Sequence, residues 1–259
     1  MSIVINTNVP ALMAAHHVRK TRDGLETAME RLASGSRINS AADDAAGAGI
    51  SMRLMSQIKG SAMAMRNVED AISMAQVADG ALIEVENMLS RMYELAVQKV
   101  NSTTYTTTDI ANITAEMNQL STEIGAIATN TKFNNTAVSA ASLVVAQEFD
   151  GGTETYTMPT FLAASAVTSA SAASAVLTGI ESVAGYRGTL ASFINRFEYK
   201  VNNLSILNAN TAAAHSRIND TDYAAESANV AKGQVLQQAG AAMLAQANAS
   251  SQYVLTLLQ

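Results

Sequence analysis

Cysteine is absent from the 259 residues of the chain. The sequence therefore offers no disulfide framework and no thiolate ligand for a metal, and nothing in it depends on the redox state of its compartment. Histidine is scarce too, with only His16, His17 and His215. None belongs to a His-Glu-x-x-His motif, in which two imidazoles and a base face one zinc ion. We expect no metal site.

Charged residues are also few. They make up 15% of the chain and leave a formal net charge of -6, whereas about 25% is ordinary for a globular protein. The basic residues are scattered and offer no electrostatic footprint for a phosphate backbone, so nucleic acid is not an expected partner. Because 48% of the chain is hydrophobic, it should fold. So little surface charge indicates a surface that is covered by other protein.

Long hydrophobic runs are missing as well. No stretch reaches the roughly 18 uninterrupted apolar residues of a membrane helix, so we expect no membrane insertion. The segment from Met1 to Pro10 contains neither Lys nor Arg and only a short apolar run, and thus lacks both parts of a secretory signal. If the protein is exported, it uses another route.

What the sequence does contain is helical periodicity. Apolar residues recur at steps of three and four, which places them along one side of an α-helix. The seam that begins at Ile58 implies a rod of roughly 60 Å. The Thr-rich stretch from Thr103 to Asp109 supplies loop and N-cap chemistry before the next helix. The seams are Ile58, Met65, Val68, Ile72, Ala75, Leu82, Val85, Leu89, Met92 and Ala96; Ile110, Ile113, Met117, Leu120, Ile124 and Ile127; and Leu190, Ile194, Phe197, Val201, Leu204, Asn208, Thr211, His215 and Ile218.

The two ends of the chain carry weaker seams. Each terminal helix is too small to be stable alone, since tertiary packing supplies most helical stability. The two must therefore pack on each other or on neighbouring copies, and we expect the C-terminal helix to be ordered mainly on assembly. We predict an assembly interface at Ile5, Val9, Leu12, Leu25, Leu32, Leu236, Met243, Ala247, Val254 and Leu257.

The middle of the chain, from Lys132 to Arg187, has a different pattern. Residues 142–149 and 153–161 are rich in β-branched and aromatic residues, and Asp150-Gly151-Gly152 between them is a turn signal, which predicts a β-hairpin near residues 140–162. The low-complexity tract 163–182 is assigned to neither strand nor loop and is interpreted as a surface excursion. The fold class is therefore mainly α, with long antiparallel coiled-coil-like helices, a small β-hairpin region and paired terminal helices.

Nothing in the sequence indicates catalysis. Gly47 and Gly49 lack the third glycine and the preceding strand of a dinucleotide fingerprint, so we interpret them as a bend between helices. Asp43 and Asp44 are consecutive, diverge on a helix, and are expected to cap a helix or bind an arginine. We expect no enzyme and no cofactor.

The 13 methionines allow two interpretations. Residues such as Met52, Met55 and Met63 could line a promiscuous peptide groove, but methionine also fills irregular helix interfaces. We favour packing in the core.

Several stretches resemble the bacterial flagellins. Near the start, the resemblance lies in Glu30-Arg31-Leu32-Ala33-Ser34-Gly35-Ser36-Arg37-Ile38-Asn39-Ser40-Ala41-Ala42-Asp43-Asp44-Ala45-Ala46-Gly47 and in Glu94-Leu95-Ala96-Val97-Gln98. Near the end, it lies in Ser216-Arg217-Ile218, Asp222-Tyr223, Leu236-Gln237-Gln238-Ala239-Gly240 and Leu244-Ala245-Gln246-Ala247-Asn248. The regions that contain these matches, at both ends, make up about half of the chain.

This resemblance implies two domains. Residues 1–44 and 219–259 would pair as an inner terminal-helix domain, and residues 45–218 would form a helical rod with the hairpin. The middle is too short for a large outer domain. The implied function is that of a structural subunit of the flagellar filament, which polymerises through its terminal helices into a helical propeller for swimming.

The resemblance also implies partners and a location. The subunit would leave the cell unfolded through the flagellar type III export apparatus, without a cleavable signal peptide and escorted by an export chaperone. In the extracellular filament it would contact other flagellin subunits, the cap protein and the hook-filament junction proteins.

Three positions, Arg91, Leu95 and Glu116, match family positions bound by the flagellin-sensing Toll-like receptor of vertebrates. The neighbouring Ser90 and Tyr93 depart from the strongly recognised pattern, so we do not expect recognition. Without a receptor, Arg91 and Leu95 lie four apart on one helical face and would belong to the subunit interface.

Two alternatives stand beside the filament subunit. A hook-filament junction protein has the same rod architecture, but such proteins tend to have Pro after the Asp-Asp pair, where this chain has Ala45. A flagellin that carries a metallopeptidase insert would need a His-Glu-x-x-His motif and a longer middle segment.

Overall fold

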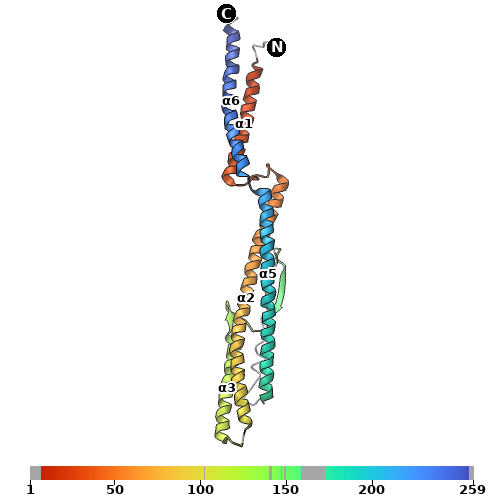
Figure 1. Ribbon diagram of the computed structural model, residues 1–259, viewed down its shortest axis with the longest axis vertical. Helices are drawn as coiled ribbons and strands as arrows, with labels where there is room; N and C mark the ends of the chain where they lie inside the picture. Colours follow the sequence, from red (N-terminus) through yellow and green to blue (C-terminus); the bar gives the residue numbers. More distant parts are fainter. Residues whose placement is uncertain are drawn as a thin grey trace. The chain divides into compact units, whose positions relative to one another are not determined.

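The computed structural model describes residues 7–101, 103–139, 142–146, 148, 150–158 and 173–256. Helices dominate these residues (Figure 1), and none of them is long and apolar enough to cross a membrane. The helices are α1 (Val9–Ser34), α2 (Ala45–Val100), α3 (Thr107–Asn130), α5 (Ala173–Asn219) and α6 (Tyr223–Thr256). The strands are β1 (Lys132–Phe133), β2 (Thr136–Ala137), β3 (Ser142–Ala146) and β4 (Thr153–Thr157). This arrangement confirms the predicted fold class.

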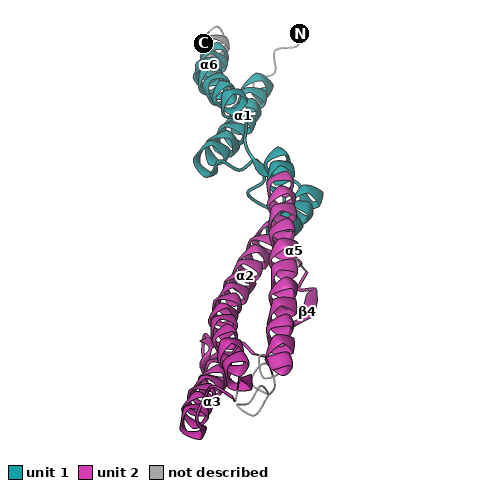
Figure 2. Ribbon diagram, turned by 60° about the horizontal axis from the view of Figure 1, so that its bottom comes forward, with its two compact units in different colours: residues 1–55, 212–259 teal, residues 56–211 magenta. Residues whose placement is uncertain are grey.

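The chain divides into two compact units, which Figure 2 colours separately. Unit 1 consists of residues 1–55 and 212–259, and unit 2 of residues 56–211. The sequence placed the division after residue 44 and before residue 219. The first turns of α2 and the last turns of α5 fall within unit 1, where the Ser51 hydroxyl lies 3.0 Å from His215 Nε2.

Unit 2 has a continuous apolar core between α2, α3 and α5. The seam residues predicted for α2 supply its centre, including the fully buried Leu82, Leu89 and Met92. Helix α3 contributes Met117 and Ile124, and α5 adds several more. Most predicted seam members on α2 and α3 pack in this core at helical spacing, and Val68 and Phe197 pack in a second cluster with Tyr156, which confirms the seams within unit 2. The predicted end of the α5 seam, Thr211, His215 and Ile218, is half-buried and belongs to neither cluster.

Two polar contacts fix the direction in which α5 runs along α2. Near one end, the amide of Asn208 donates to the Ile58 carbonyl at 3.1 Å and to the hydroxyl of the buried Ser61 at 2.9 Å. Further along, Arg187 Nε donates to Asp79 at 2.9 Å. Since the residue number rises on α2 as it falls on α5, the two helices are antiparallel.

The predicted β-hairpin is present. Strands β3 and β4 pair antiparallel with Val144 opposite Thr155, and Gly151 in the turn has a φ of 88°, a left-handed conformation that suits glycine. The hairpin packs on the helices through Tyr156, whose ring meets Phe193 and Phe197 edge-on with centroids 5.2 and 4.7 Å away. Pro159 lies outside the described residues.

The interpretation of residues 163–182 as a surface excursion is wrong for its last ten residues. Helix α5 begins at Ala173, and Val176 and Gly179 are buried. Alanine is the best helix former, and Val176, Val183 and Leu190 continue the seam by steps of seven. The low complexity of this tract concealed that period. Residues 163–172 lie outside the described part of the chain.

Helix α3 begins with a capping box. The Thr106 hydroxyl accepts from the backbone N–H of Asp109 at 3.3 Å, and the Asp109 carboxylate accepts from the Thr106 backbone N–H at 3.0 Å. These reciprocal bonds satisfy donors that a helix start leaves unpaired. The Thr106 hydroxyl also donates to the Asp109 carboxylate at 2.6 Å, and this bond, followed by the one from the Thr106 N–H, holds the pKa of Asp109 below its ordinary value. The N-cap expected in the Thr-rich stretch is confirmed.

Replacing this cap should weaken unit 2 measurably. Thr106→Ala is expected to lower the free energy of unfolding by about 1 kcal/mol, because the Asp109 N–H loses its acceptor. Urea unfolding followed by circular dichroism would measure the change. Thr108→Ala, two residues into the same helix, makes the same chemical change without removing a cap and should leave stability unchanged or slightly higher. Equal losses in both variants would contradict this assignment.

Candidate assembly surface of the terminal helices

Local sequence signals set both ends of α1. The Asn8 side chain accepts from the Ala11 N–H at 3.2 Å as N-cap, and Pro10 stands in the first turn, where its missing N–H costs nothing. At the other end, the Gly35 N–H donates to the Arg31 carbonyl at 2.9 Å with a φ of 72°. A side chain at Gly35 would be strained in that left-handed conformation and would also meet the Tyr223 hydroxyl at 3.1 Å.

Helices α1 and α6 form an antiparallel pair. Asn8 Nδ2 donates to the Ala247 carbonyl at 3.1 Å near one end, and Arg31 pairs with Glu226 at 3.1 Å near the other. In Figure 1 the two helices lie side by side. The predicted pairing of the terminal helices is confirmed.

Glycines allow close approach along this pair. A Cβ on Gly233 would lie 3.2 Å from the Leu25 side chain, and a Cβ on Gly240 only 2.5 Å from Val18 Cγ2. A side chain at Gly240 would collide with Val18 unless the Val18 side chain shifted. Close approach has a cost, because glycine contributes no apolar area of its own.

Unit 1 consequently has almost no core. Among its described residues, Ala28 is the only hydrophobic residue with a fully buried side chain, and every other member of the buried core belongs to unit 2. Glu226 is the buried charged residue of unit 1, at 7% exposed. Two helices of 26 and 34 residues therefore pair without the apolar burial that ordinarily stabilises them.

The predicted interface residues fall into three groups. Val9, Leu12, Leu236 and Met243 are exposed, at 52%, 66%, 47% and 63%. Leu25, Leu32 and Ala247 are half-buried in the pair of α1 with α6. Ile5 and Leu257 lie outside the described residues, and Val254 belongs to α6 but its side chain is not described.

Sequence reasoning missed several contacts within the pair. The side of α6 that packs against α1 includes Glu226, Gly233 and Gly240, none of which is among the predicted interface residues. These residues are not apolar, so a search for apolar periodicity passes over them. The signal that could have found them is the seven-residue interval between the two glycines and between Gly233 and Glu226.

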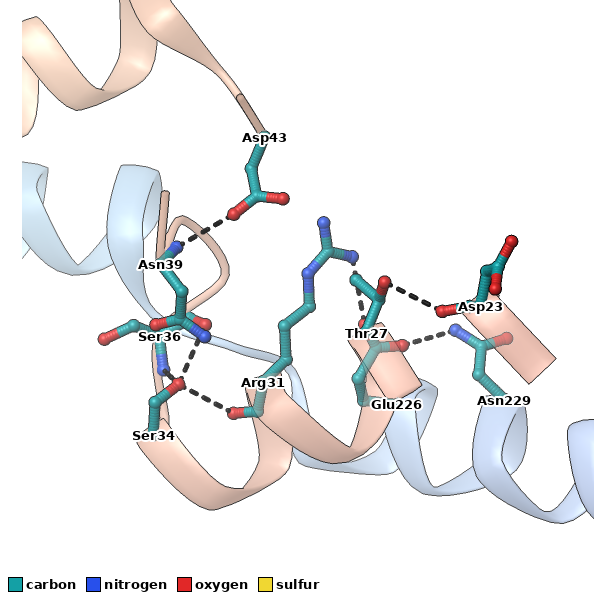
Figure 3. Close-up of polar contacts among 9 residues, drawn as sticks. All are labelled: Asp23, Thr27, Arg31, Ser34, Ser36, Asn39, Asp43, Glu226 and Asn229. Carbon is teal, nitrogen blue, oxygen red and sulfur yellow. Dashed lines mark hydrogen bonds and ion pairs between the residues drawn. The ribbon is translucent and has the colours of Figure 1, made fainter. Parts of the chain in front are cut away.

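Figure 3 shows the ion pair between Arg31 and Glu226, in which the Glu226 side chain is 9% exposed and that of Arg31 30%. Arg31 Nη1 donates to one carboxylate oxygen of Glu226, and the side-chain amide of Asn229 donates to the other. The hydrogen bond from Asn229 and then the one from Arg31 hold the pKa of Glu226 below its ordinary value of 4.5. These donors satisfy a carboxylate that would otherwise be buried at a high cost.

The segment after α1 is held by backbone and aspartate hydrogen bonds. Ser36 forms a bridge with Asp220, and the Arg37 N–H donates to the Asn219 carbonyl at 2.6 Å. The Asp43 carboxylate, drawn in Figure 3, accepts from the backbone N–H groups of Ser40 at 2.9 Å and Asn39 at 3.1 Å, which lower its pKa.

Asp44 caps helix α2. Its carboxylate accepts from the Gly47 N–H at 2.8 Å, immediately before the helix begins at Ala45. The predicted capping role is confirmed for Asp44, whereas Asp43 accepts from Asn39 and Ser40 in the loop before the helix. The bend proposed at Gly47 and Gly49 is wrong, since both lie within α2. Gly47 serves close packing instead, because a Cβ there would lie 2.8 Å from the Ile38 side chain.

The three receptor-type positions do not form one exposed surface. Arg91 donates to Glu94 at 2.9 Å and to Glu116 at 3.0 Å, and the side chains of Arg91, Glu94 and Glu116 are well exposed. Leu95 is only 2% exposed and belongs to the core of unit 2, because it stands on the seam side of α2. It offers no surface to a receptor or to another subunit.

The methionines also differ from expectation. Met74 is buried as predicted, but Met52, Met55 and Met63 are 74%, 38% and 52% exposed. Core packing is therefore wrong for these three. They lie along the outward side of α2, where helical periodicity alone did not separate them from the core.

The ion pair makes unit 1 sensitive to acid. A carboxyl whose pKa is lower in the folded state stabilises that state above the unfolded pKa, and this contribution is lost as the pH falls through the folded pKa. The melting temperature should thus fall below about pH 4.5. Circular dichroism during heating, which follows the loss of helix, would measure it. Glu226→Gln should flatten that dependence, whereas Glu30→Gln, an exposed change on α1, should keep it. A Glu226→Gln profile identical to the unmodified chain would exclude the role of the pair.

Comparison with known proteins gives a consistent result. The bacterial flagellin N-terminal helical region matches residues 5–141, and the C-terminal helical region matches residues 174–258. A crystal structure of Bacillus cereus flagellin is also similar, with 27% identity and a TM-score of 0.45. The match covers 58% of this chain and 94% of the chain in that crystal structure.

Individual relatives match over nearly their whole length. A flagellin from Halalkalibacterium halodurans is 38% identical, covering 99% of this chain and 100% of the relative. A flagellin from Bacillus subtilis is 34% identical, covering 98% and 99%. The flagellar filament 33 kDa core protein of Treponema phagedenis is 33% identical, covering 99% and 100%. By these matches, the chain belongs to the bacterial flagellin family.

Proposed function

We propose that the chain is a structural subunit of a bacterial flagellar filament and that it polymerises through its terminal helices. The observation that carries this proposal is the contrast within unit 1. Its paired helices bury almost no apolar side chains among the described residues, yet they expose several large ones. A surface of this kind is completed by other copies of the chain.

The exposed side chains give assembly an adequate driving force. Burial of a large apolar side chain contributes roughly 1.5–3 kcal/mol, and part of this gain offsets the cost of ordering the helices. Leu236 and Met243, seven residues apart, lie on one face of α6, and Val9, Leu12 and Met13 lie together on α1. Because the faces on α1 and α6 differ, one contact set repeated from copy to copy would build an open helical polymer.

The relatives support the same assignment. Those from Treponema phagedenis and Brachyspira hyodysenteriae are named flagellar filament core proteins. A subunit of this kind acts mechanically as part of an extracellular helical propeller for swimming, with other flagellin subunits as its main partners and with no catalytic role. A hook-filament junction protein is not favoured, because the relatives are named flagellins or flagellar filament core proteins.

The two units suit different tasks in such a filament. Unit 1 would form the inner terminal-helix domain, where neighbouring copies cover its helices, and unit 2 would form the helical rod with its own core. Export through the type III apparatus with a chaperone, and growth beneath the cap protein, follow from the family resemblance. Recognition by the Toll-like receptor is not proposed, since Leu95 is buried.

A charge on the exposed face of α1 should stop growth of the polymer. Leu12→Asp places a carboxylate where an apolar contact with a neighbour is expected, and burial of an unpaired charge is costly. Seeded polymerisation, followed by light scattering and electron microscopy, should show no filament extension. The urea unfolding of unit 2 should stay unchanged, because its core does not include Leu12.

Gln238→Asp is the matched control. Gln238 is an exposed polar residue on α6, so this variant adds the same carboxylate without removing an apolar contact. It should extend seeds at close to the rate of the unmodified chain. Extension by Leu12→Asp at the unmodified rate would refute assembly through this face.

A further inference from the structure

The exposure of the described methionines differs between the two units. Every described methionine of unit 1 is exposed, and we call these five residues the unit 1 methionines. They are Met13 at 61%, Met29 at 54%, Met52 at 74%, Met55 at 38% and Met243 at 63% exposed. In unit 2 the core methionines are at most 6% exposed, and they are Met74, Met92, Met117 and Met158.

This division matters because the chain has no cysteine. Thioether sulfurs are then its most readily oxidised groups. With hydrogen peroxide, the sulfur lone pair attacks one peroxide oxygen, the O–O bond breaks, and an S–O bond forms. Sulfur is oxidised by two electrons, and peroxide is reduced to water. A thiol-dependent methionine sulfoxide reductase reverses the step, with the thiols oxidised to a disulfide and the oxygen released as water.

Oxidation would change the surface on which assembly depends. Methionine is flexible and apolar, whereas its sulfoxide is polar and accepts hydrogen bonds. An exposed sulfoxide is satisfied by water in the free subunit. When a neighbouring copy covers it, the S=O group loses water and finds no donor arranged for it, so assembly is disfavoured.

We propose that the unit 1 methionines are a reversible oxidation site through which peroxide blocks assembly of the free subunit. The inference rests on the proposed function, since it needs these side chains to be covered by neighbouring copies. Three of the five, Met13, Met29 and Met243, stand on the helices α1 and α6 themselves. Met13 also follows Leu12 on the exposed face of α1.

Met63 provides an internal comparison in unit 2. It is 52% exposed, and its sulfur lies 4.0 Å from Nη1 of Arg66. A sulfoxide oxygen at this position would have a guanidinium donor beside it. Met63 is therefore open to peroxide but lies outside unit 1, so its oxidation alone should not decide assembly.

The test compares subunits before and after treatment with hydrogen peroxide. Peptide mass spectrometry locates the added oxygen atoms, and seeded polymerisation measures the rate of growth. The oxidised unmodified chain should extend seeds about tenfold more slowly or worse. A variant that carries M13L, M29L, M52L, M55L and M243L should grow at a similar rate with and without peroxide, since leucine resists peroxide at similar volume. M63L should be as sensitive as the unmodified chain.

A second measurement covers the case in which the five leucines impair growth by themselves. Repair of the oxidised unmodified chain by a methionine sulfoxide reductase and dithiothreitol should restore its rate. Growth at the untreated rate with all five unit 1 methionines oxidised would overturn the inference, as would a rate that reductase does not restore. Failure of the untreated chain to grow would instead refute the proposed function.

Discussion

The pairing of α1 with α6 across a seam that has almost no apolar core is the constraint on which the rest depends. Gly233 and Gly240 let the helices approach closely, and the contact between Arg31 and Glu226 fixes their register. Neither interaction buries much apolar surface, whereas Leu12, Leu236 and Met243 face outward. A helix pair of this kind has direction and register but little apolar burial, and under the proposed function neighbouring copies supply the missing stability.

Unit 2 differs in that it completes its own core. Leu82, Leu89 and Phe197 are at most 1% exposed, and the polar contact between Ser61 and Asn208 lies at a defined level between α2 and α5. A buried polar contact of this type sets register because any slip would leave its donor unpaired. The same chain thus combines a unit with its own apolar core and a unit that, under the proposed function, is completed by assembly.

Much of the fold could be predicted from the sequence, because apolar periodicity records which side of a long helix is buried. The seams of α2, α3 and α5, the cap at Thr106 and the β3–β4 hairpin all followed from that rule and from turn chemistry. The rule failed where the contact is not apolar. Gly233 and Glu226 meet α1 without an apolar signal, and the alanine-rich start of α5 has too little contrast between its faces. The outward position of Met52 was missed because composition alone does not place a residue on a face.

Amide hydrogen exchange of the free subunit and of the filament tests the central claim most directly, since it reports local opening helix by helix. In the free subunit, the amides of α1 and α6 should exchange far faster than those of α2, α3 and α5 within unit 2. In the filament, the two terminal helices should gain strong protection while unit 2 changes little. Equal and strong protection of α1 and α6 in the free subunit would contradict the account, because the helices would then be stable without neighbours.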